Sequence, residues 1–273
     1  MKLIHAHKLQ QIWNLLEFEL LNRGCAELDS SWSYVYACPA FSRLYYTLDG
    51  SGWVELQGQR AELHAGTVCL IPARSPVRCG CPERMTQLYF HISARTCDGY
   101  DLFSRCSRIL ELPAPDAAGL GALFTSGRML DGALLKNRIE ADLWRLIAEG
   151  GLEDSLLASR SAFLERVFAA VRQNLNARLK ISDVADMLSL PESTLVKRFH
   201  REFGITLGRY IDEMLYQEIV RLLHVSDLSI GQIADRLGFC DQFYLSRFFK
   251  KYQSESPARY RARTRSLMPD GAR

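Results

Sequence analysis

The 273-residue sequence lacks the features that mark secreted, membrane-spanning and disordered proteins. Its N-terminus, MKLIHAHKLQQ, has no apolar core followed by a small-residue cleavage site, and no apolar run approaches the roughly 18 residues that a membrane span needs. No low-complexity tract is present, and 48% apolar with 24% charged residues is ordinary for a globular chain. We therefore expect a folded cytoplasmic protein with no membrane partner.

Paired cysteine spacing is also missing, although eight cysteines are present: Cys25, Cys38, Cys69, Cys79, Cys81, Cys97, Cys106 and Cys240. In a reducing compartment we expect free thiols, most of them small core residues. The nearest approach to a metal motif is Cys79-x-Cys81, to which Cys69, Cys97 or Cys106 could add a ligand. A CxC without a matched second pair is not specific. Thiol or metal sensing therefore stays an alternative function.

The length and the charge distribution both indicate two parts. A chain of 273 residues exceeds what one hydrophobic core usually serves. The net charge of +3 divides into −2 for residues 1–160 and +5 for residues 161–273. A basic half is typical of a module that binds phosphates. Since Gly, Ser, Asp and Glu accumulate near residues 150–161, we predict domains at residues 1–155 and 161–265.

The N-terminal half alternates short apolar stretches with turn signals. The predicted strands are residues 32–36, 43–48, 53–56, 61–63, 67–71 and 85–92. Residues 49–52 (DGSG), Gln57-Gly58 and Ala65-Gly66 supply the residues that tight hairpins prefer. Many short strands at this spacing predict an antiparallel β-barrel.

Two helices are predicted to flank the barrel. The first carries Ile12, Leu15, Leu16 and Leu20 at helical spacing, with Gly24 as its C-terminal stop. The second has an apolar stripe of Leu134, Leu135, Ile139, Leu143, Leu146 and Ile147, and ends at Gly150-Gly151. This stripe needs a partner surface, which is either its own barrel or a second subunit. We expect a homodimer through the N-terminal half, with packing on the barrel as the alternative.

The C-terminal half contains an internal repeat. Residues 184–188 (VADML) recur as residues 233–237 (IADRL), and residues 195–199 (LVKRF) recur as residues 245–249 (LSRFF). Each copy predicts a short helix, a turn and a second helix rich in Lys and Arg, which is a helix-turn-helix unit. The helical stretch 206–224 between them spans roughly 27 Å, so the two copies could occupy successive major grooves of DNA.

The second helix of each copy carries the residues that could read bases. The exposed positions are Glu192, Ser193, Val196 and Lys197 in the first copy, and Asp241, Gln242, Phe243, Ser246 and Arg247 in the second. Arg can bind guanine and Gln can bind adenine through two hydrogen bonds, and an apolar side chain can contact the thymine methyl group. The alternative is a plain helical bundle whose basic residues are solvated surface.

Residues 229–250 (SIGQIADRLGFCDQFYLSRFFK), followed by Ser256-Pro257, resemble the AraC family of bacterial transcription regulators. The resemblance covers about residues 165–265. It implies binding to double-stranded DNA, with RNA polymerase as a candidate partner, and it places base contacts at Ser193, Val196, Lys197, Gln242, Phe243, Ser246 and Arg247. The chain departs from the family at Pro191, Leu215 and Ser254. Whether it activates or represses, and on which operator, stays open.

Residues 66–72 (GTVCLIP) resemble the strand and turn of a cupin barrel. The fold class implied by both resemblances is α+β multidomain, with an N-terminal cupin-like antiparallel β-barrel with flanking helices and a C-terminal all-α tandem helix-turn-helix domain. Metal-dependent cupin enzymes carry His-x-His and Glu on one strand and a further His after the turn. Here residues 43–48 read RLYYTL, and Val77 and Arg78 follow the turn. We therefore expect no metal, no cofactor and no catalysis, with a cupin-type enzyme as the alternative.

Strand alternation predicts where a small effector binds. It places Arg43, Tyr45 and Thr47 on one face of a strand, Gln87, Tyr89 and His91 on another, and Trp32, Tyr34 and Tyr36 on a third. We predict that Arg43, Tyr45, Gln87, Tyr89, His91 and Trp32 bind a small polar molecule. The family resemblance favours a sugar. The alternative is that these are ordinary core or outward-facing residues.

Overall fold

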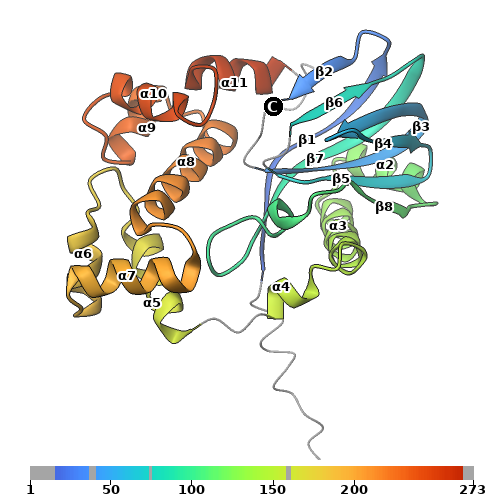
Figure 1. Cartoon of the computed structure of the whole chain (residues 1–273). Helices are drawn as coiled ribbons and strands as arrows, with labels where there is room; N and C mark the ends of the chain where they lie inside the picture. Colours follow the sequence, from blue (N-terminus) through green and yellow to red (C-terminus); the bar gives the residue numbers. More distant parts are fainter. Residues whose placement is uncertain (1–15, 37–40, 74–75, 158–160, 267–273) are drawn as a thin grey trace, which may run out of the picture. The chain divides into compact units, whose positions relative to one another are not determined.

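The computed structural model describes residues 16–36, 41–73, 76–157 and 161–266, and they form two compact units (Figure 1). The first unit holds the chain up to Thr96 and from Asp101 to Leu157, and it is built on a β-sheet. The second holds the helices that follow, together with residues 97–100. None of the helices in the described ranges is both long and apolar enough to cross a membrane.

Among its described residues, the sheet unit contains eight antiparallel strands. They are β1 (Glu17–Asp29), β2 (Ser33–Tyr36), β3 (Ser42–Leu56), β4 (Gln59–His64), β5 (Thr67–Ile71), β6 (Val77–Gly80), β7 (Arg84–Arg95) and β8 (Leu110–Pro113). The main order is β1-β7-β3-β5-β8, while β4 and β6 pair with β3, and β2 pairs with β6. A short 3-10 helix, η1 (Leu102–Arg105), follows β7. The antiparallel sheet of the predicted barrel is confirmed, with β1, β6 and β8 as strands that the pattern did not indicate.

The two ends of strand β3 pair with different strands. Residues Ser42 to Thr47 pair with β5 and β7, whereas Ser51 to Leu56 pair with β4. The prediction of a tight hairpin at residues 49–52 is wrong, because β3 continues through them with a register shift between Thr47 and Asp49. Gly50 has φ +73°, and a Cβ there would lie 2.1 Å from the Arg84 carbonyl oxygen. The glycine therefore allows the strand to bend past β7 rather than to end.

The predicted opening helix is wrong where the structure describes it. Leu16 precedes β1, and Leu20 and Gly24 lie within that strand, which pairs with β7 over twelve residue pairs. Ile12 and Leu15 lie outside the described residues. A Cβ on Gly24 would lie 2.5 Å from the Tyr89 hydroxyl oxygen, so this glycine serves a close cross-strand approach and not a helix end. Pairing with the long strand β7 overrides the local helical spacing.

Helices α2 (Ala117–Thr125) and α3 (Met129–Glu149) pack against one face of the sheet, and α4 (Glu153–Leu157) follows (Figure 1). The helix predicted from the apolar stripe is confirmed as α3, which ends at Gly150. Within the described core, the stripe residues Leu135, Leu143, Leu146 and Ile147 pack with Leu44, Tyr46, Leu88 and Phe90 of the sheet. Most of the stripe therefore packs on its own sheet, as the alternative interpretation had it.

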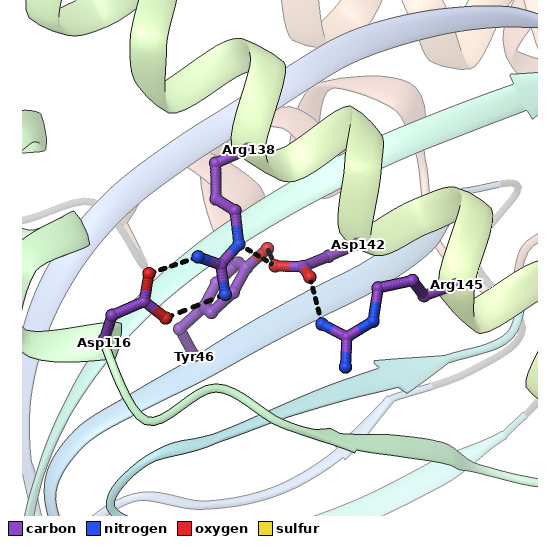
Figure 2. A network of polar contacts seen from close by, with 5 residues as sticks. All are labelled: Tyr46, Asp116, Arg138, Asp142 and Arg145. Carbon is purple, nitrogen blue, oxygen red and sulfur yellow. Dashed lines mark hydrogen bonds and ion pairs between the residues drawn. The ribbon is translucent and has the colours of Figure 1, made fainter.

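A buried carboxylate fastens α3 to the sheet. Asp142, whose side chain is 1% exposed, accepts hydrogen bonds from the Tyr46 hydroxyl at 3.0 Å, from Arg138 Nε at 2.9 Å and from Arg145 Nη1 at 2.9 Å (Figure 2). Arg138 also binds both carboxylate oxygens of Asp116, at the start of α2. Burial, and then the charge of Asp142, raise the pKa of Tyr46, so its phenol stays a donor. The network joins β3, α2 and α3.

The helical unit contains α5 (Ala162–Asn174), α6 (Ile181–Leu188), α7 (Glu192–Phe203), α8 (Leu207–Val225), α9 (Ile230–Arg236), α10 (Gln242–Lys250) and α11 (Pro257–Ser266) (Figure 1). Helices α6 and α7 form the first predicted helix-turn-helix unit, α9 and α10 form the second, and α8 connects them. Leu195, Phe199, Leu245 and Phe249 are fully buried, as the repeat predicted. The tandem helix-turn-helix prediction is confirmed.

Candidate nucleic-acid interface and effector site

The two recognition helices expose the same positions. In α7, Leu195 and Phe199 face the core, and in α10 Leu245 and Phe249 do so. The predicted base-reading positions lie on the outer side of each helix. Ser193, Lys197, Gln242, Phe243 and Arg247 are exposed, and Val196 and Ser246 are half-buried at equivalent places. Ser193, Val196 and Lys197 of α7 therefore match Phe243, Ser246 and Arg247 of α10, and Gln242 adds a seventh position.

The second set is better supported by its surroundings. Asp241 caps α10 by accepting a hydrogen bond from the Tyr244 amide at 2.6 Å, whereas Pro191 at the same place before α7 makes no side-chain cap. The Arg247 guanidinium lies 5.5 Å from the centre of the Tyr244 ring. Tyr244 is 47% exposed beside Phe243, and sequence reasoning missed it as a candidate contact. Tyr244 lies three residues before Arg247, on the same side of a helix, and this spacing could have indicated it from the sequence.

Two features hold the helix-turn-helix units in register with each other. The connecting helix α8 has 19 residues, about 28 Å at 1.5 Å per residue, and most of its length is buried. In addition, the segment after α5 bonds to the turn of the second unit. The Ala177 amide donates to the Leu237 carbonyl at 2.7 Å, and Arg178 Nε donates to the Gly238 carbonyl at 3.1 Å. The two helix-turn-helix units therefore belong to one compact body, the helical unit.

The predicted effector residues form a ladder across β3 and β7. Arg43 pairs with His91, Tyr45 with Tyr89, and Thr47 with Gln87. All six side chains are buried, and they lie on the face opposite to Leu44, Tyr46, Leu88 and Phe90, because side chains alternate along a strand. His91 stacks on Phe41 at 4.7 Å between ring centres. The structure thus brings together five of the six predicted residues, with Thr47 added.

Three polar atoms of this ladder have no hydrogen-bond partner among the described residues: Thr47 Oγ1, Gln87 Nε2 and Tyr89 OH. Burial also raises the pKa of the Tyr89 phenol, which keeps it a donor. Buried polar groups are normally hydrogen-bonded, and exceptions often mark a ligand or functional site. Trp32 is buried as well, but it precedes β2 and is not part of the ladder.

Of the cysteines proposed as an alternative sensor, Cys69, Cys79, Cys81 and Cys106 are buried, whereas Cys97 is exposed. Burial raises the pKa of the Cys79 thiol to about 11, and it also raises the pKa values of Cys69 and Cys81. The Cys79 thiol lies 3.7 Å from the Tyr34 carbonyl oxygen. Protonated thiols are poor metal ligands. No group of three His, Cys, Asp or Glu residues that could hold a metal ion occurs in the described ranges.

Two family models match the chain. An AraC-like ligand binding domain matches residues 28–160, and a helix-turn-helix domain matches residues 184–263. Among curated proteins, the multiple antibiotic resistance protein MarA of Salmonella typhimurium is 33% identical over 91 residues, which cover 33% of this chain and 72% of MarA. The chain belongs to the AraC family.

Another AraC-family relative is the Msm operon regulatory protein of Streptococcus mutans, 29% identical over 104 residues. The match covers 38% of this chain and only 37% of that relative's length. Of the solved structures, Vibrio cholerae ToxT with a bound unsaturated fatty acid has a TM-score of 0.54 at 14% identity, covering 89% of this chain and 94% of ToxT. At that identity the likeness shows a shared two-domain fold.

Proposed function

We propose that this AraC-family chain is a transcription regulator that binds double-stranded DNA in a sequence-specific manner and responds to a small molecule. The observation that carries the proposal is the pair of recognition helices, α7 and α10, which expose matching positions and are held in register by α8. A phosphate-binding role also agrees with the net charge of the C-terminal half. The protein would act in the cytoplasm as a binding protein and not as an enzyme, with RNA polymerase as a further partner.

Within this proposal, Gln242, Phe243, Ser246 and Arg247 read bases in one major groove, and Ser193, Val196 and Lys197 contact the next. Arg247 offers two parallel donors, which suit guanine, and Gln242 suits adenine. Phe243, at 69% exposed, offers an apolar surface for a thymine methyl group.

The test is a comparison of Arg247→Ala with Arg172→Ala, which removes an exposed arginine from α5. A preferred duplex is first selected from a random library with the unmodified protein. Affinities for that duplex and for a scrambled one are then measured at two salt concentrations. A bidentate contact to guanine is worth about 1–3 kcal/mol, so Arg247→Ala should lower the specificity ratio by about 5- to 150-fold. Arg172→Ala should leave the ratio unchanged.

An unchanged ratio for Arg247→Ala would remove this residue from the base-reading set, and an even loss on both duplexes would assign it to phosphate contact. Failure to select any preferred duplex would contradict sequence-specific binding itself.

For the effector we propose the ladder of Arg43, Tyr45, Thr47, Gln87, Tyr89 and His91, with Trp32 as a further contact. Thr47 Oγ1, Gln87 Nε2 and Tyr89 OH supply hydrogen-bonding groups for a polar ligand, and the aromatic rings supply stacking surface. Sugars combine both kinds of surface. A carbohydrate library screened by thermal shift should raise the melting temperature, and Thr47→Val with Gln87→Met should abolish the shift. No shift with any sugar would contradict the carbohydrate class.

We also propose a homodimer. Although most of the α3 stripe packs on its own sheet, α3 leaves Met129, Leu130, Leu134 and Trp144 exposed. A second copy would cover this apolar surface. Light scattering at micromolar concentration should give twice the 31.1 kDa chain mass. Leu130→Glu with Leu134→Glu should return the monomer mass, and a monomer in the unmodified protein would contradict the proposal.

A further inference from the structure

A pocket of about 660 Å³ lies in the sheet unit, between helices α2 and α3 and the strands β1 and β7. Its floor is apolar and includes Phe18 of β1 together with Phe90 and Ile92 of β7. Leu123 and Phe124 of α2 and Leu135, Ile139 and Leu143 of α3 form its walls. The volume falls in the range of small-molecule sites. Phe90 and Ile92 alternate with Tyr89 and His91, so this pocket lies on the opposite face of β7 from the polar ladder.

The charged residues at this pocket are mostly basic. Arg23, Arg128 and Lys136 line it, as do the acids Glu19 and Glu140. Both acids have basic partners, since Glu140 pairs with Lys136 at 2.6 Å and Glu19 pairs with Arg95 at 3.0 Å. Arg95 also pairs with Glu17 at 3.3 Å. Arg128 has one distant partner, Asp131, at 3.8 Å, and Arg23 is exposed with no ion pair in the part of the chain that the structure describes. Two cations are thus available to a ligand at the mouth of an apolar pocket.

From this arrangement we infer a second ligand site, for an amphipathic anion whose hydrocarbon chain lies between α3 and the β1–β7 face and whose acidic head binds Arg23 and Arg128. The position of the site gives it a structural role. Its α3 wall is the helix that Asp142 fastens to β3 and α2, so a ligand here contacts the helix that carries the exposed apolar side chains. This inference does not depend on the DNA-binding proposal.

The test uses octanoate and decanoate, with decanol and decyltrimethylammonium as uncharged and cationic matches, titrated into the full chain by calorimetry without DNA. Each buried methylene should tighten binding about fourfold, so decanoate should bind more than tenfold better than octanoate, with about one molecule per chain. Decanoate should bind better than decanol, and decyltrimethylammonium should bind worst. The centre of the Trp144 ring lies 5.8 Å from that of Phe18, which lines the pocket. The fluorescence of Trp144 should therefore change on binding.

Two pairs of variants locate the ligand. Gly132 lines the pocket on α3 and Gly119 lies on α2 outside it, and a Cβ at either position meets nothing within 4 Å. Gly132→Phe should fill the pocket and weaken decanoate about tenfold or more, while Gly119→Phe should not. Arg23→Gln should weaken decanoate about fivefold and leave decanol unchanged, whereas Arg84→Gln, elsewhere on the sheet, should change neither.

Several results would overturn the inference. Decanoate binding that is not saturable, or that Gly132→Phe leaves intact, places the ligand elsewhere. Equal losses of decanoate and decanol in Arg23→Gln, or tight binding of decyltrimethylammonium, contradict an anionic head group. If Gly132→Phe changes the molecular mass in solution and not ligand binding, the pocket is an interface between copies of the chain. Thr47→Val with Gln87→Met should retain decanoate binding, and its loss would merge this site with the ladder.

Discussion

The Tyr100 hydroxyl donates a hydrogen bond to Glu213 Oε2 at 2.6 Å, although the two residues are 113 positions apart. Glu213 belongs to α8, and its other oxygen accepts from Arg209 Nε at 2.8 Å. The Tyr100 ring also lies about 6 Å from the rings of Phe203 and Tyr210. The Tyr210 hydroxyl in turn donates to the Asp98 carbonyl at 2.8 Å. Residues 97–100 are therefore an integral part of the helical unit.

We expect Tyr100→Phe to destabilise the helical unit by about 2 kcal/mol, because a hydrogen bond to a largely buried carboxylate is lost. Urea unfolding followed by helical circular dichroism measures the effect. Tyr244→Phe, which removes an exposed hydroxyl in the same unit, is the control and should change the unfolding free energy by less than about 0.5 kcal/mol. Equal effects of the two variants would show that the Tyr100–Glu213 bond contributes nothing of its own.

Asp142→Asn should lower the unfolding free energy by about 3 kcal/mol, since it removes the buried charge that Arg138, Arg145 and Tyr46 share. The control is Glu149→Gln on the same helix, where the ion pair with Arg108 at 3.6 Å is about half exposed. Exposed pairs are worth little, so this change should cost less than about 0.5 kcal/mol. If Asp142→Asn is as mild as Glu149→Gln, the network in Figure 2 does not fasten α3.

Asp101 gives the stability of the sheet unit a pH dependence. Burial raises the pKa of its carboxyl to about 6, against hydrogen bonds from the Ala94 amide, the Ser42 hydroxyl and the Phe103 amide that oppose the shift. A carboxyl whose pKa is raised on folding stabilises the fold most when protonated, below about pH 4. That contribution is lost as the pH rises to about 6, and amounts to about 3 kcal/mol at most.

Asp101→Asn removes this titration. The advantage of the unmodified protein over the variant should therefore be larger at pH 4 than at pH 7, as measured by urea unfolding at both values. A constant difference between the two proteins would mean that Asp101 does not titrate in this range.

The turns of the two helix-turn-helix units can be compared by a pair of reciprocal substitutions, from serine to glycine and from glycine to serine. Ser189 in the first and Gly238 in the second occupy matching places, with φ +54° and +73°. This left-handed conformation costs a residue with a Cβ about 1 kcal/mol or more, and glycine almost nothing. Ser189→Gly should therefore stabilise the helical unit by about 0.5–1 kcal/mol, and Gly238→Ser should destabilise it by about 1–2 kcal/mol. Thermal unfolding of both variants would reveal changes of the wrong sign.

The helical half could be predicted closely because its determinants are local. The apolar spacing that recurs in residues 184–188 and 233–237 acts within a few residues, and the structure contains the predicted helices. The strand 67–71 and the turn at Gln57-Gly58 were also local and are present as predicted.

The parts that sequence did not predict depend on distant partners. Leu20 and Gly24 fit a helix by spacing, but both pair with the long strand β7. Leu20 lies opposite Ile92, 72 positions later, and Gly24 lies opposite Tyr89, 65 positions later. The packing of Tyr100 in the helical unit depends on its hydrogen bond to Glu213, and no local sequence pattern marks either residue. The apolar pocket likewise depends on residues of β1, β7, α2 and α3, which are distant in the sequence. For the ladder, alternation indicated which residues share a face, while the cross-strand register of Arg43 with His91 required the structure.

The hydrogen bonds from Ala177 and Arg178 to Leu237 and Gly238 fix the spacing of the two recognition helices. Because the spacing of the two recognition helices is fixed by the protein, the DNA must supply their two contact segments at one separation and on one side of the duplex. Inserting about five base pairs between the segments turns one of them to the far side, since a full helical turn takes about 10.5 base pairs. We expect such a duplex to be bound by only one helix-turn-helix unit. Arg178→Ala removes one of the bonds that fix this spacing. When one or two base pairs are inserted between the segments, the variant should therefore lose less affinity than the unmodified protein does.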